Sequence, residues 1–419
     1  MIRAIKGTRD ILPPESEIWN QVENLAREIL LLYGFSEIRT PIFENTELFS
    51  RGVGKDTDIV SKEMYSFLDR NNRSITLRPE GTASVVRSYL EHQLYNDPQI
   101  LKLYYLGPMF RRERPQKGRS RQFHQLGVEV LGSDHPAIEA EVIEMLQLFL
   151  NRVGITNTEL LLNSIGCSHC RPNYLKILKI KLINTQANLC VDCQRRALTN
   201  PLRVLDCKIE SCQLIIKSLP SILDFLDQPC QKHFEQFLQY LKDRHIKYKV
   251  APLLVRGLDY YTQTTFEITS TSLGAQNTLV GGGRYDGLAE LLGGQSTQGF
   301  GFALGIERII LLLQEKFASL TPKTPTIFLA PLGEKGFKKA TLVAQNLRNQ
   351  GLRCLLDFTP RSLKSAMRLA NKLKTQYLLI VGSEELESGK YPLKRMHDGT
   401  QILVEEKEIF YKIENGLEN

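Results

Sequence analysis

The stretch that decides the fold is GPMFRRERPQKGRSRQFHQLGVE, residues 107–129. Six cationic side chains fall within the eleven residues 111–121, between two runs of strand-forming residues. A loop between two strands can direct guanidinium groups at phosphate and carboxylate oxygens, and Phe123 offers a flat surface for a purine base. Gln125 and Glu129 share one face of the second strand, and a polar row in a cleft needs a polar ligand. The alternative is a basic loop exposed to solvent.

Strand-forming runs surround this stretch and indicate a mixed domain. They cover residues 36–41, 73–77, 102–106 and 123–131. Apolar residues at helical spacing predict helices over residues 15–33 and 136–153. Turns and irregular loops separate most of the strands, where a parallel sheet would need crossover helices. We therefore expect an α+β domain built on a largely antiparallel sheet.

Beyond this domain the pattern changes twice. Residues 163–250 carry most of the cysteines and read as a helical insertion, after which strand character returns at 250–255 and 264–269. A glycine-rich segment at 277–301 and a buried helix at 305–313 close the first domain. The sequence thus predicts one discontinuous domain, residues 1–162 and 251–317, interrupted by the insertion.

A second α/β pattern follows a predicted linker at residues 318–325. Strands are expected at 326–330, 352–357 and 377–381, and helices at 336–350 and 362–374. This alternation predicts a small α/β domain over residues 326–419. A generic nucleotide-binding fold is the alternative, but the segment after its first strand lacks a glycine-rich phosphate loop.

Composition and charge limit the class of protein. Of the 419 residues, 42% are hydrophobic and 24% charged, which is typical of folded domains. No apolar run approaches the ~20 residues of a membrane span, and the first ten residues lack a secretory signal pattern. We expect a protein of the cytoplasm, or of an organelle's stroma or matrix, with no membrane partner.

The net charge of +8 is unevenly distributed. Residues 163–250 have 14 Lys and Arg against 7 Asp and Glu, and residues 325–419 have 15 against 11. These segments carry +7 and +4, which leaves −3 for the remainder of the +8 chain. The pattern fits a protein that grips a polyanion, although solvated lysine-rich helices would give the same counts.

The cysteines of the insertion have the spacing of a metal site. Cys167-x2-Cys170 is followed after 19 residues by Cys190-x2-Cys193. This spacing predicts a structural zinc site formed by these four thiols, with Cys207 and a further downstream cysteine, Cys212, as substitute ligands. Reduced free cysteines are the alternative.

Four further stretches combine glycine with charged and aromatic residues. They are LRPEGT (77–82), LVRGLDYYT (254–262), GGGRYDGL (281–288) and GFGFALGIER (299–308). RGLDYY and GGGRYDGL resemble the two histidine-specific motifs of the histidyl-tRNA synthetase family. FRRERP (110–115) and GIER (305–308) resemble motifs 2 and 3 of class II aminoacyl-tRNA synthetases, and Pro41 with FENTELF (43–49) resembles the dimer-forming motif 1. The resemblance runs from Lys6 to beyond residue 400.

This resemblance implies the class II synthetase fold and an ATP-dependent ligation. L-histidine would be joined to the 3′ end of tRNA(His) through a histidyl-adenylate, with release of AMP and diphosphate, and ATP would act with Mg²⁺. Residues 1–162 and 251–317 would then form the catalytic domain, and residues 326–419 an anticodon-binding domain. Motif 1 implies a homodimer.

The resemblance also implies roles for individual residues. Arg256 and Arg111 match catalytic positions. Positions for ATP are matched by Arg111 at the α-phosphate, Arg308 at the far phosphates, Phe123 at the adenine, and Arg119. Positions for histidine are matched by Glu80, Thr82, Arg111, Gln125, Glu129, Arg256, Tyr260 and Tyr261. Within that set Glu80, Thr82 and Gln125 would receive the ammonium group, and Glu129 and Tyr261 the imidazole nitrogens.

Two rival functions share much of this pattern. One is a catalytically silent paralogue that regulates the first enzyme of histidine biosynthesis. Such paralogues usually lack the C-terminal domain and the RGLDYY signature, both of which this chain has. The other is a related synthetase for threonine, proline or glycine, which the histidine-specific motifs disfavour.

Overall fold

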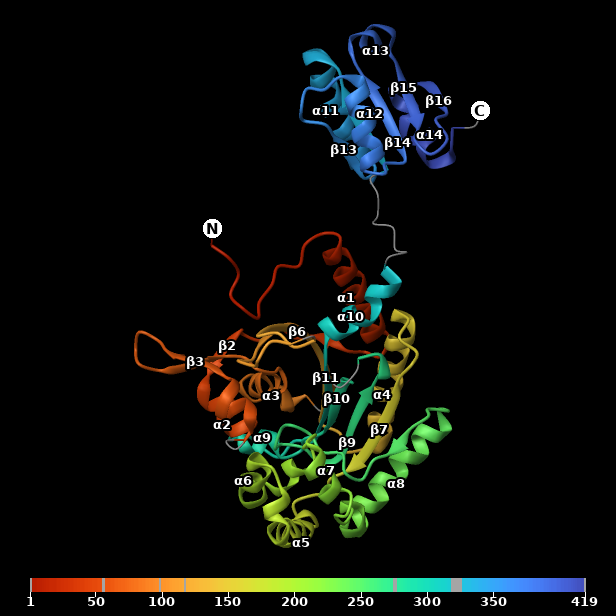
Figure 1. Cartoon of the computed structure of the whole chain (residues 1–419). Coiled ribbons are helices and arrows are strands. Elements are labelled where there is room, and N and C mark those ends of the chain that lie inside the picture. The colour runs from red at the N-terminus through yellow and green to blue at the C-terminus, as the bar shows by residue number, and fades with distance from the viewer. Residues whose placement is uncertain are drawn as a thin grey trace. The chain divides into compact units, whose positions relative to one another are not determined.

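The computed structural model describes residues 2–54, 57–97, 99–116, 118–273, 277–317 and 326–417. The chain forms two compact units, Met1–Phe317 and Ala318–Asn419 (Figure 1). The linker predicted for residues 318–325 lies outside the described residues. No described helix is both long enough and apolar enough to cross a membrane.

An eight-stranded sheet is the frame of the first unit, in the order β1-β5-β6-β11-β10-β9-β7-β8. Its strands are β1 (Ser36–Glu37), β5 (Leu101–Phe110), β6 (Gln122–Leu131), β7 (Glu159–Ser164), β8 (Lys249–Val250), β9 (Thr262–Thr269), β10 (Thr278–Arg284) and β11 (Gly299–Gly305). Every internal pairing is antiparallel, and the short edge strands β1 and β8 pair in parallel. The prediction of a largely antiparallel sheet is therefore confirmed.

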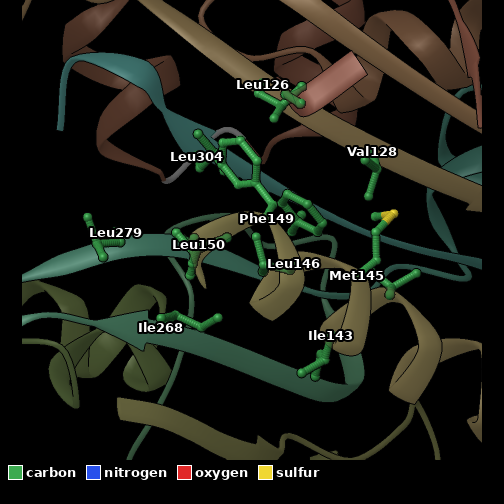
Figure 2. Close-up of a cluster of buried hydrophobic side chains, with 14 of the residues drawn as sticks. Leu126, Val128, Ile143, Met145, Leu146, Phe149, Leu150, Ile268, Leu279 and Leu304 are labelled. Atoms are coloured by element: carbon green, nitrogen blue, oxygen red, sulfur yellow. The ribbon is translucent and has the colours of Figure 1, made fainter. Parts of the chain in front are cut away.

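The two faces of this sheet differ as strand alternation requires. On β6, Leu126 and Val128 join the hydrophobic core, whereas Gln125 and Glu129 point to the opposite face. Helix α4 (Pro136–Val153) lies on the apolar face, within the predicted bounds, and packs against α1 (Glu15–Leu32) and α8 (Gln228–Asp243). Figure 2 shows part of this core, with labelled residues Leu126, Val128, Ile143, Met145, Leu146, Phe149, Leu150, Ile268, Leu279 and Leu304.

A second, three-stranded sheet of the unit has the order β2-β4-β3. Its strands are β2 (Phe43–Asn45), β3 (Tyr65–Leu68) and β4 (Ser74–Leu77), and the nearby helices are α2 (Thr46–Gly52), α3 (Thr82–Glu91) and α9 (Leu288–Leu291). Helix α10 (Ile306–Phe317) packs against α1, and its residues Ile306, Ile309 and Ile310 join the core on the apolar face of the large sheet.

The segment after residue 164 is helical, as expected. Its helices are α5 (Arg171–Asn184), α6 (Val191–Thr199), α7 (Glu210–Ile216) and α8, and the first three gather at one end of the unit (Figure 1). Their hydrophobic cluster is continuous with Tyr260, Tyr261 and Tyr285. The insertion therefore packs directly against residues that the family resemblance assigned to the site.

The strand predicted for residues 250–255 is wrong beyond Val250. Pro252 has no N–H to give to a ladder, and Asn163 Nδ2 donates instead to the carbonyls of Pro252 (3.1 Å) and Leu254 (2.9 Å). These bonds fix the segment as a loop at the edge of the sheet.

The second unit contains a five-stranded sheet in the order β13-β12-β14-β15-β16. Its elements are β12 (Ile327–Pro331), α11 (Gly333–Asn349), β13 (Cys354–Leu356), α12 (Leu363–Lys372), β14 (Tyr377–Val381), α13 (Ser383–Ser388), β15 (Lys390–Arg395), β16 (Gln401–Glu405) and α14 (Ile409–Asn415). The first three strands are parallel, as the predicted α/β alternation requires. The antiparallel hairpin β15–β16 follows them and was not predicted.

Candidate active site

One cavity on the polar face of the large sheet collects most of the predicted site residues. Ten of the eleven line it: Glu80, Thr82, Arg111, Arg119, Phe123, Gln125, Arg256, Tyr260, Tyr261 and Arg308. The eleventh, Glu129, is buried next to Thr82. Segments that are far apart in sequence thus meet at one place, while the role of each residue stays a prediction.

Two buried carboxylates stand at one end of this cavity. Glu80 precedes helix α3 and accepts the backbone N–H groups of Thr82 (2.8 Å) and Ala83 (2.9 Å). Glu129 accepts the hydroxyls of Thr82 (2.6 Å) and Tyr285 (2.5 Å). Burial raises the pKa of both carboxyls, that of Glu129 to about 8. Burial therefore favours the protonated form of Glu129.

Glycines make room for the groups at this end. A Cβ on Gly301 of β11 would lie 2.2 Å from Glu129 Oε2. The ring of Tyr105 lies between Gly81 and Gly127, where added Cβ atoms would come within 2.3 and 2.2 Å of it. Glycine is thus needed at these positions, because the side chains of Glu129 and Tyr105 from neighbouring strands occupy the space that a Cβ would fill.

Arg256 also needs a neighbouring glycine to make room for its side chain. Its guanidinium forms an ion pair with Glu267 of β9 and lies 6.0 Å from the centre of the Tyr261 ring. A Cβ on Gly281 of β10 would come within 1.9 Å of Arg256 Nη2. Gly281 and Gly301 of the glycine-rich segment therefore lie in central strands that admit this arginine and Glu129, whereas the residues between these strands form turns and helix α9.

Two polar atoms of the cavity have no protein partner. Oε1 of Gln125 and Nε of Arg256 are buried and make no hydrogen bond with the described residues. An unpaired buried acceptor or donor costs roughly 1–3 kcal/mol. Both residues line the cavity, so a ligand with a donor and an acceptor there would recover this cost.

Arginines of the strand-loop-strand stretch line a second part of the cavity, which we call its arginine end, with Arg111 adjoining the segment that carries Glu80. Arg111 donates from Nε to the Pro79 carbonyl (2.9 Å), and its guanidinium lies 5.2 Å from the centre of the Phe123 ring. Arg119 pairs with Glu113 at 3.0 Å. Arg308 comes from α10 and donates to the Thr278 carbonyl. This end thus offers three cations beside an aromatic face.

Several residues of the site were not predicted from the sequence. Tyr105, Tyr285 and Glu267 support the predicted groups from neighbouring strands, as described above. Glu307 lines the cavity and accepts the backbone N–H of His124 at 2.9 Å. A charged residue between Phe266 and Ile268 was the available signal for Glu267, because an ion is rarely placed inside an apolar strand without a partner.

The four thiols predicted to share one zinc do not lie together. Cys190 and Cys193 group with Cys207 and Cys212, and we call this set the four-cysteine cluster. The prediction of a single set was wrong because each Cys-x2-Cys pair lies at the start of a different helix, α5 or α6, and faces its own downstream partners.

The other pair belongs to a second set. Cys167 and Cys170 group with Asp227 and Cys230, which we call the three-cysteine cluster. The sequence signal for these partners was Asp-x2-Cys at 227–230, which repeats the spacing of the cysteine pairs.

Comparison with protein families gives two matches that together cover most of the chain. A model described as histidyl-tRNA synthetase matches residues 7–170 and 198–309. A model described as an anticodon binding domain matches residues 326–415. Residues 171–197, which contain Cys190 and Cys193, lie outside both matches.

Individual proteins match over the full length. The histidine–tRNA ligase of Solibacter usitatus is 52% identical over 99% of this chain and 99% of its own. That of Halothermothrix orenii is 52% identical over 96% of each chain. Among solved structures, apo histidyl-tRNA synthetase from S. aureus superposes with a TM-score of 0.84 at 38% identity, covering 99% of this chain and 100% of that one.

Proposed function

The chain belongs to the histidyl-tRNA synthetase family, and we propose that the cavity on its large sheet carries out the family's reaction. The enzyme activates L-histidine with ATP to histidyl-adenylate, releasing diphosphate. It then transfers the histidyl group to the 3′ end of tRNA(His), releasing AMP. Full-length identity of 52% to a histidine–tRNA ligase carries this conclusion.

In the first step, a carboxylate oxygen of histidine attacks the α-phosphorus of ATP. The new O–P bond forms as the bond to the diphosphate oxygen breaks, so negative charge accumulates on the phosphoryl oxygens. Arg111 and Arg256 are the proposed catalytic residues because both line the cavity with guanidinium groups. Fixed cations stabilise the transition state, in which this charge has developed, more than they stabilise the ground state. This difference lowers the barrier and accelerates the reaction.

Recognition of histidine is assigned to the buried end. Glu80, Thr82 and Gln125 would receive the ammonium group, and the unpaired Gln125 Oε1 is an acceptor suited to it. Glu129 and Tyr261 would bind the imidazole, beside Tyr260. Since Glu129 and a ring nitrogen can share one proton, the pair is satisfied in either protonation arrangement. A side chain without those nitrogens would leave buried polar groups unpaired.

ATP is assigned to the arginine end. Phe123 would face the adenine, Arg111 the α-phosphate, and Arg119 and Arg308 the remaining phosphates. Mg²⁺ bound with ATP would offset phosphate charge, and Glu113 and Glu307 supply carboxylate oxygens of the kind it prefers. The proposed anticodon contacts belong to residues 326–419, in agreement with the matched anticodon binding domain.

The domain limits are proposed as read from the sequence. Residues 1–162 and 251–317 would form the catalytic domain, residues 163–250 the insertion, and residues 326–419 the anticodon-binding domain. Zinc bound by the insertion is part of the proposal, with its thiols divided between two clusters.

The cytoplasm is the proposed location, since all eight cysteines are free, as a reducing compartment requires. Cell fractionation that found the enzyme in an organelle's stroma or matrix would favour the alternative.

A homodimer is also proposed. Large apolar side chains on the three-stranded sheet and the segment before it are exposed: Ile42 by 44%, Phe43 by 57%, Phe67 by 49% and Leu68 by 64%. Such a group marks an interface more often than a solvent face. Light scattering should give twice the chain mass of 47.8 kDa, and a monomer at all concentrations would contradict the proposal.

ATP–diphosphate exchange with each of the twenty amino acids tests the function directly. Exchange with histidine alone, in the absence of tRNA, is the expected result. No exchange with any amino acid would support a regulatory paralogue, and exchange with threonine, proline or glycine would support a related synthetase. Retention of Arg256, Tyr260 and Tyr261 together with the C-terminal domain favours the expected result.

A further inference from the structure

We propose that residues 163–250 bind two zinc ions in separate closed sites, and that the two sites hold the active-site loop 256–261 from either side. One site is the four-cysteine cluster, and the other is the three-cysteine cluster with Asp227 as its fourth ligand. The second part rests on the proposed function of the loop. The metal sites themselves do not depend on it.

The distances between donor atoms fit tetrahedral zinc. With Zn–S bonds of about 2.3 Å, the sulfurs of a tetrahedron lie about 3.8 Å apart. In the three-cysteine cluster, Cys167 and Cys170 have sulfurs 3.8 Å apart, and Cys170 and Cys230 have sulfurs 3.9 Å apart. The shorter Zn–O bond accounts for the closer approach of Asp227 Oδ2 to Cys167 Sγ, 3.3 Å.

The four-cysteine cluster has the same dimensions. The sulfurs of Cys190 and Cys207 are 4.0 Å apart, and all four lie within 4.8 Å of one another. These cysteines are free thiols, so disulfide bonds do not account for their approach. Each cluster supplies a complete set of four ligand atoms, which is typical of a structural zinc site rather than a catalytic one.

Backbone donors around the sulfurs support this interpretation. The N–H of Cys167 donates to Cys170 Sγ, and the N–H of Cys190 donates to Cys212 Sγ, both at 3.2 Å. Hydrogen bonds to sulfur favour the thiolate form, which is the form that binds metal.

The three-cysteine cluster is joined to the end of the loop through Arg171. This residue follows Cys170 and donates to the carbonyls of Ile165 (3.0 Å), Gly166 (2.9 Å) and Tyr261 (2.8 Å). Its position depends on the turn that the cluster closes. Arg171 is therefore a positioning residue for Tyr261.

The four-cysteine cluster is joined to the beginning of the loop. Between Cys193 and Cys207, Arg203 donates to the Arg256 carbonyl at 3.1 Å. From the same segment, Asn200 Nδ2 donates to Asp259 Oδ1 at 2.9 Å. Both ends of the segment 193–207 are cysteines of the cluster. A metal bound there would fix the position of this segment and so of its contacts to the loop.

Metal content of the full-length protein tests the two sites. Mass spectrometry of protein purified without added metal or chelator should find about two zinc ions per chain. Cys193→Ser and Cys230→Ser should each retain about one, and the control Cys354→Ser in the other unit should retain about two. A wild-type content of one ion or none, or iron in place of zinc, would overturn the proposal.

A second measurement keeps the test valid if a variant fails to fold. Titration of wild-type thiols with an organomercurial should release the zinc in two separable steps, followed with a metal-sensitive dye. Cobalt-reconstituted protein should show two tetrahedral absorption patterns, one from four thiolates and one from three thiolates and an oxygen ligand. A single release step with a single pattern would contradict separate sites.

The connection to the loop has its own test. Arg171→Ala and Arg203→Ala should keep about two zinc ions and raise the histidine KM in the exchange assay about tenfold, with the ATP KM changed less than about twofold. Arg171→Lys should recover part of the loss. Unchanged histidine KM values would refute the positioning role, whereas absence of exchange in the wild type would refute the proposed function and leave the zinc count intact.

Discussion

The two ends of the cavity are built in opposite ways. At the end assigned to histidine, Glu129 is 1% exposed and both of its oxygens accept hydroxyl hydrogens from the protein. At the end assigned to ATP, the side chains of Arg111 and Arg119 are 21% and 39% exposed and belong to a loop. One end is a buried hydrogen-bond network that leaves Gln125 Oε1 free for a ligand, and the other is a group of partly exposed cations.

The difference teaches how one cavity can combine selectivity with charge stabilisation. A buried network rejects ligands that leave its members unpaired, since each unpaired group costs roughly 1–3 kcal/mol. Exposed cations distinguish ligands poorly but attract any polyphosphate. We therefore expect variants at the buried end to change the response to histidine, and variants at the open end to change the response to ATP.

Arg256, which lines the same cavity and contacts Glu267 and Tyr261, should give the largest effect. We expect Arg256→Ala to lower kcat for histidine-dependent exchange by about 10³-fold, because its charge acts mainly on the transition state. The kcat of Arg256→Lys should fall between that of the wild type and that of Arg256→Ala. The matched control is Arg152→Ala, which removes an exposed arginine on α4. A rate within about threefold of the wild type would exclude a catalytic role.

Glu129→Gln should sharpen the comparison at the buried end. The amide cannot carry the shared proton, so we expect the histidine KM to rise about 10²-fold while the ATP KM stays within about twofold. Exchange kinetics with each substrate varied in turn measure both values. Glu290→Gln, on the exposed side of α9, controls for the loss of a carboxylate. Equal rises in both KM values would contradict the assignment of the buried end to histidine alone.

The same substitution should change how stability depends on pH. The native carboxyl has a pKa of about 8 against an ordinary value of 4.5, so the folded state keeps this proton over a range where the unfolded state has lost it. Glu129 therefore lowers the free energy of unfolding as pH rises from about 4.5 to about 8. The free energy of unfolding of the first unit should be measured at pH 6 and pH 8 by denaturation. Between these two values, Glu129→Gln should become about 2 kcal/mol more stable relative to the wild type. A difference independent of pH would contradict the raised pKa.

Two glycines allow a steric test of the same region. Gly281→Ala would place a Cβ at 1.9 Å from Arg256 Nη2, whereas a Cβ on Gly287 would meet nothing within 4 Å. We expect Gly281→Ala to lower kcat/KM for histidine about 30-fold and Gly287→Ala to leave it unchanged. Similar losses in both variants would mean that the displaced guanidinium is not the cause.

Arg119→Ala should give the smallest effect. An exposed arginine that pairs with Glu113 contributes modestly, so we expect the ATP KM to rise about tenfold and the histidine KM to stay within about twofold. Arg112→Ala, an exposed residue of the same loop outside the cavity, is the matched control. An unchanged ATP KM would remove Arg119 from the site.

Local signals explain what could be predicted from the sequence. Helix α4 matches its predicted bounds because Pro136 stands at its first turn and Gly154 ends it with φ of 91°. Strand β14 was found because residues 377–381 are apolar throughout. Motif spacing likewise brought together residues around one cavity that lie far apart in the chain.

Contacts over long sequence distances explain what was missed. The glycines of β10 and β11 are poor strand formers, and they form strands because β6 and β9 pair with them and need the space. Tyr285 supports Glu129 from 156 residues away. The cysteine pairs were assigned to one site because spacing cannot reveal which partners a helix start faces.

Exchange kinetics of Glu129→Gln and Arg119→Ala, measured in one assay with histidine and ATP varied separately, test the central claim most directly. The account predicts a crossover: the histidine KM rises only in Glu129→Gln, and the ATP KM rises only in Arg119→Ala. If both variants raise both KM values by the same factor, the cavity does not have separate histidine and ATP ends.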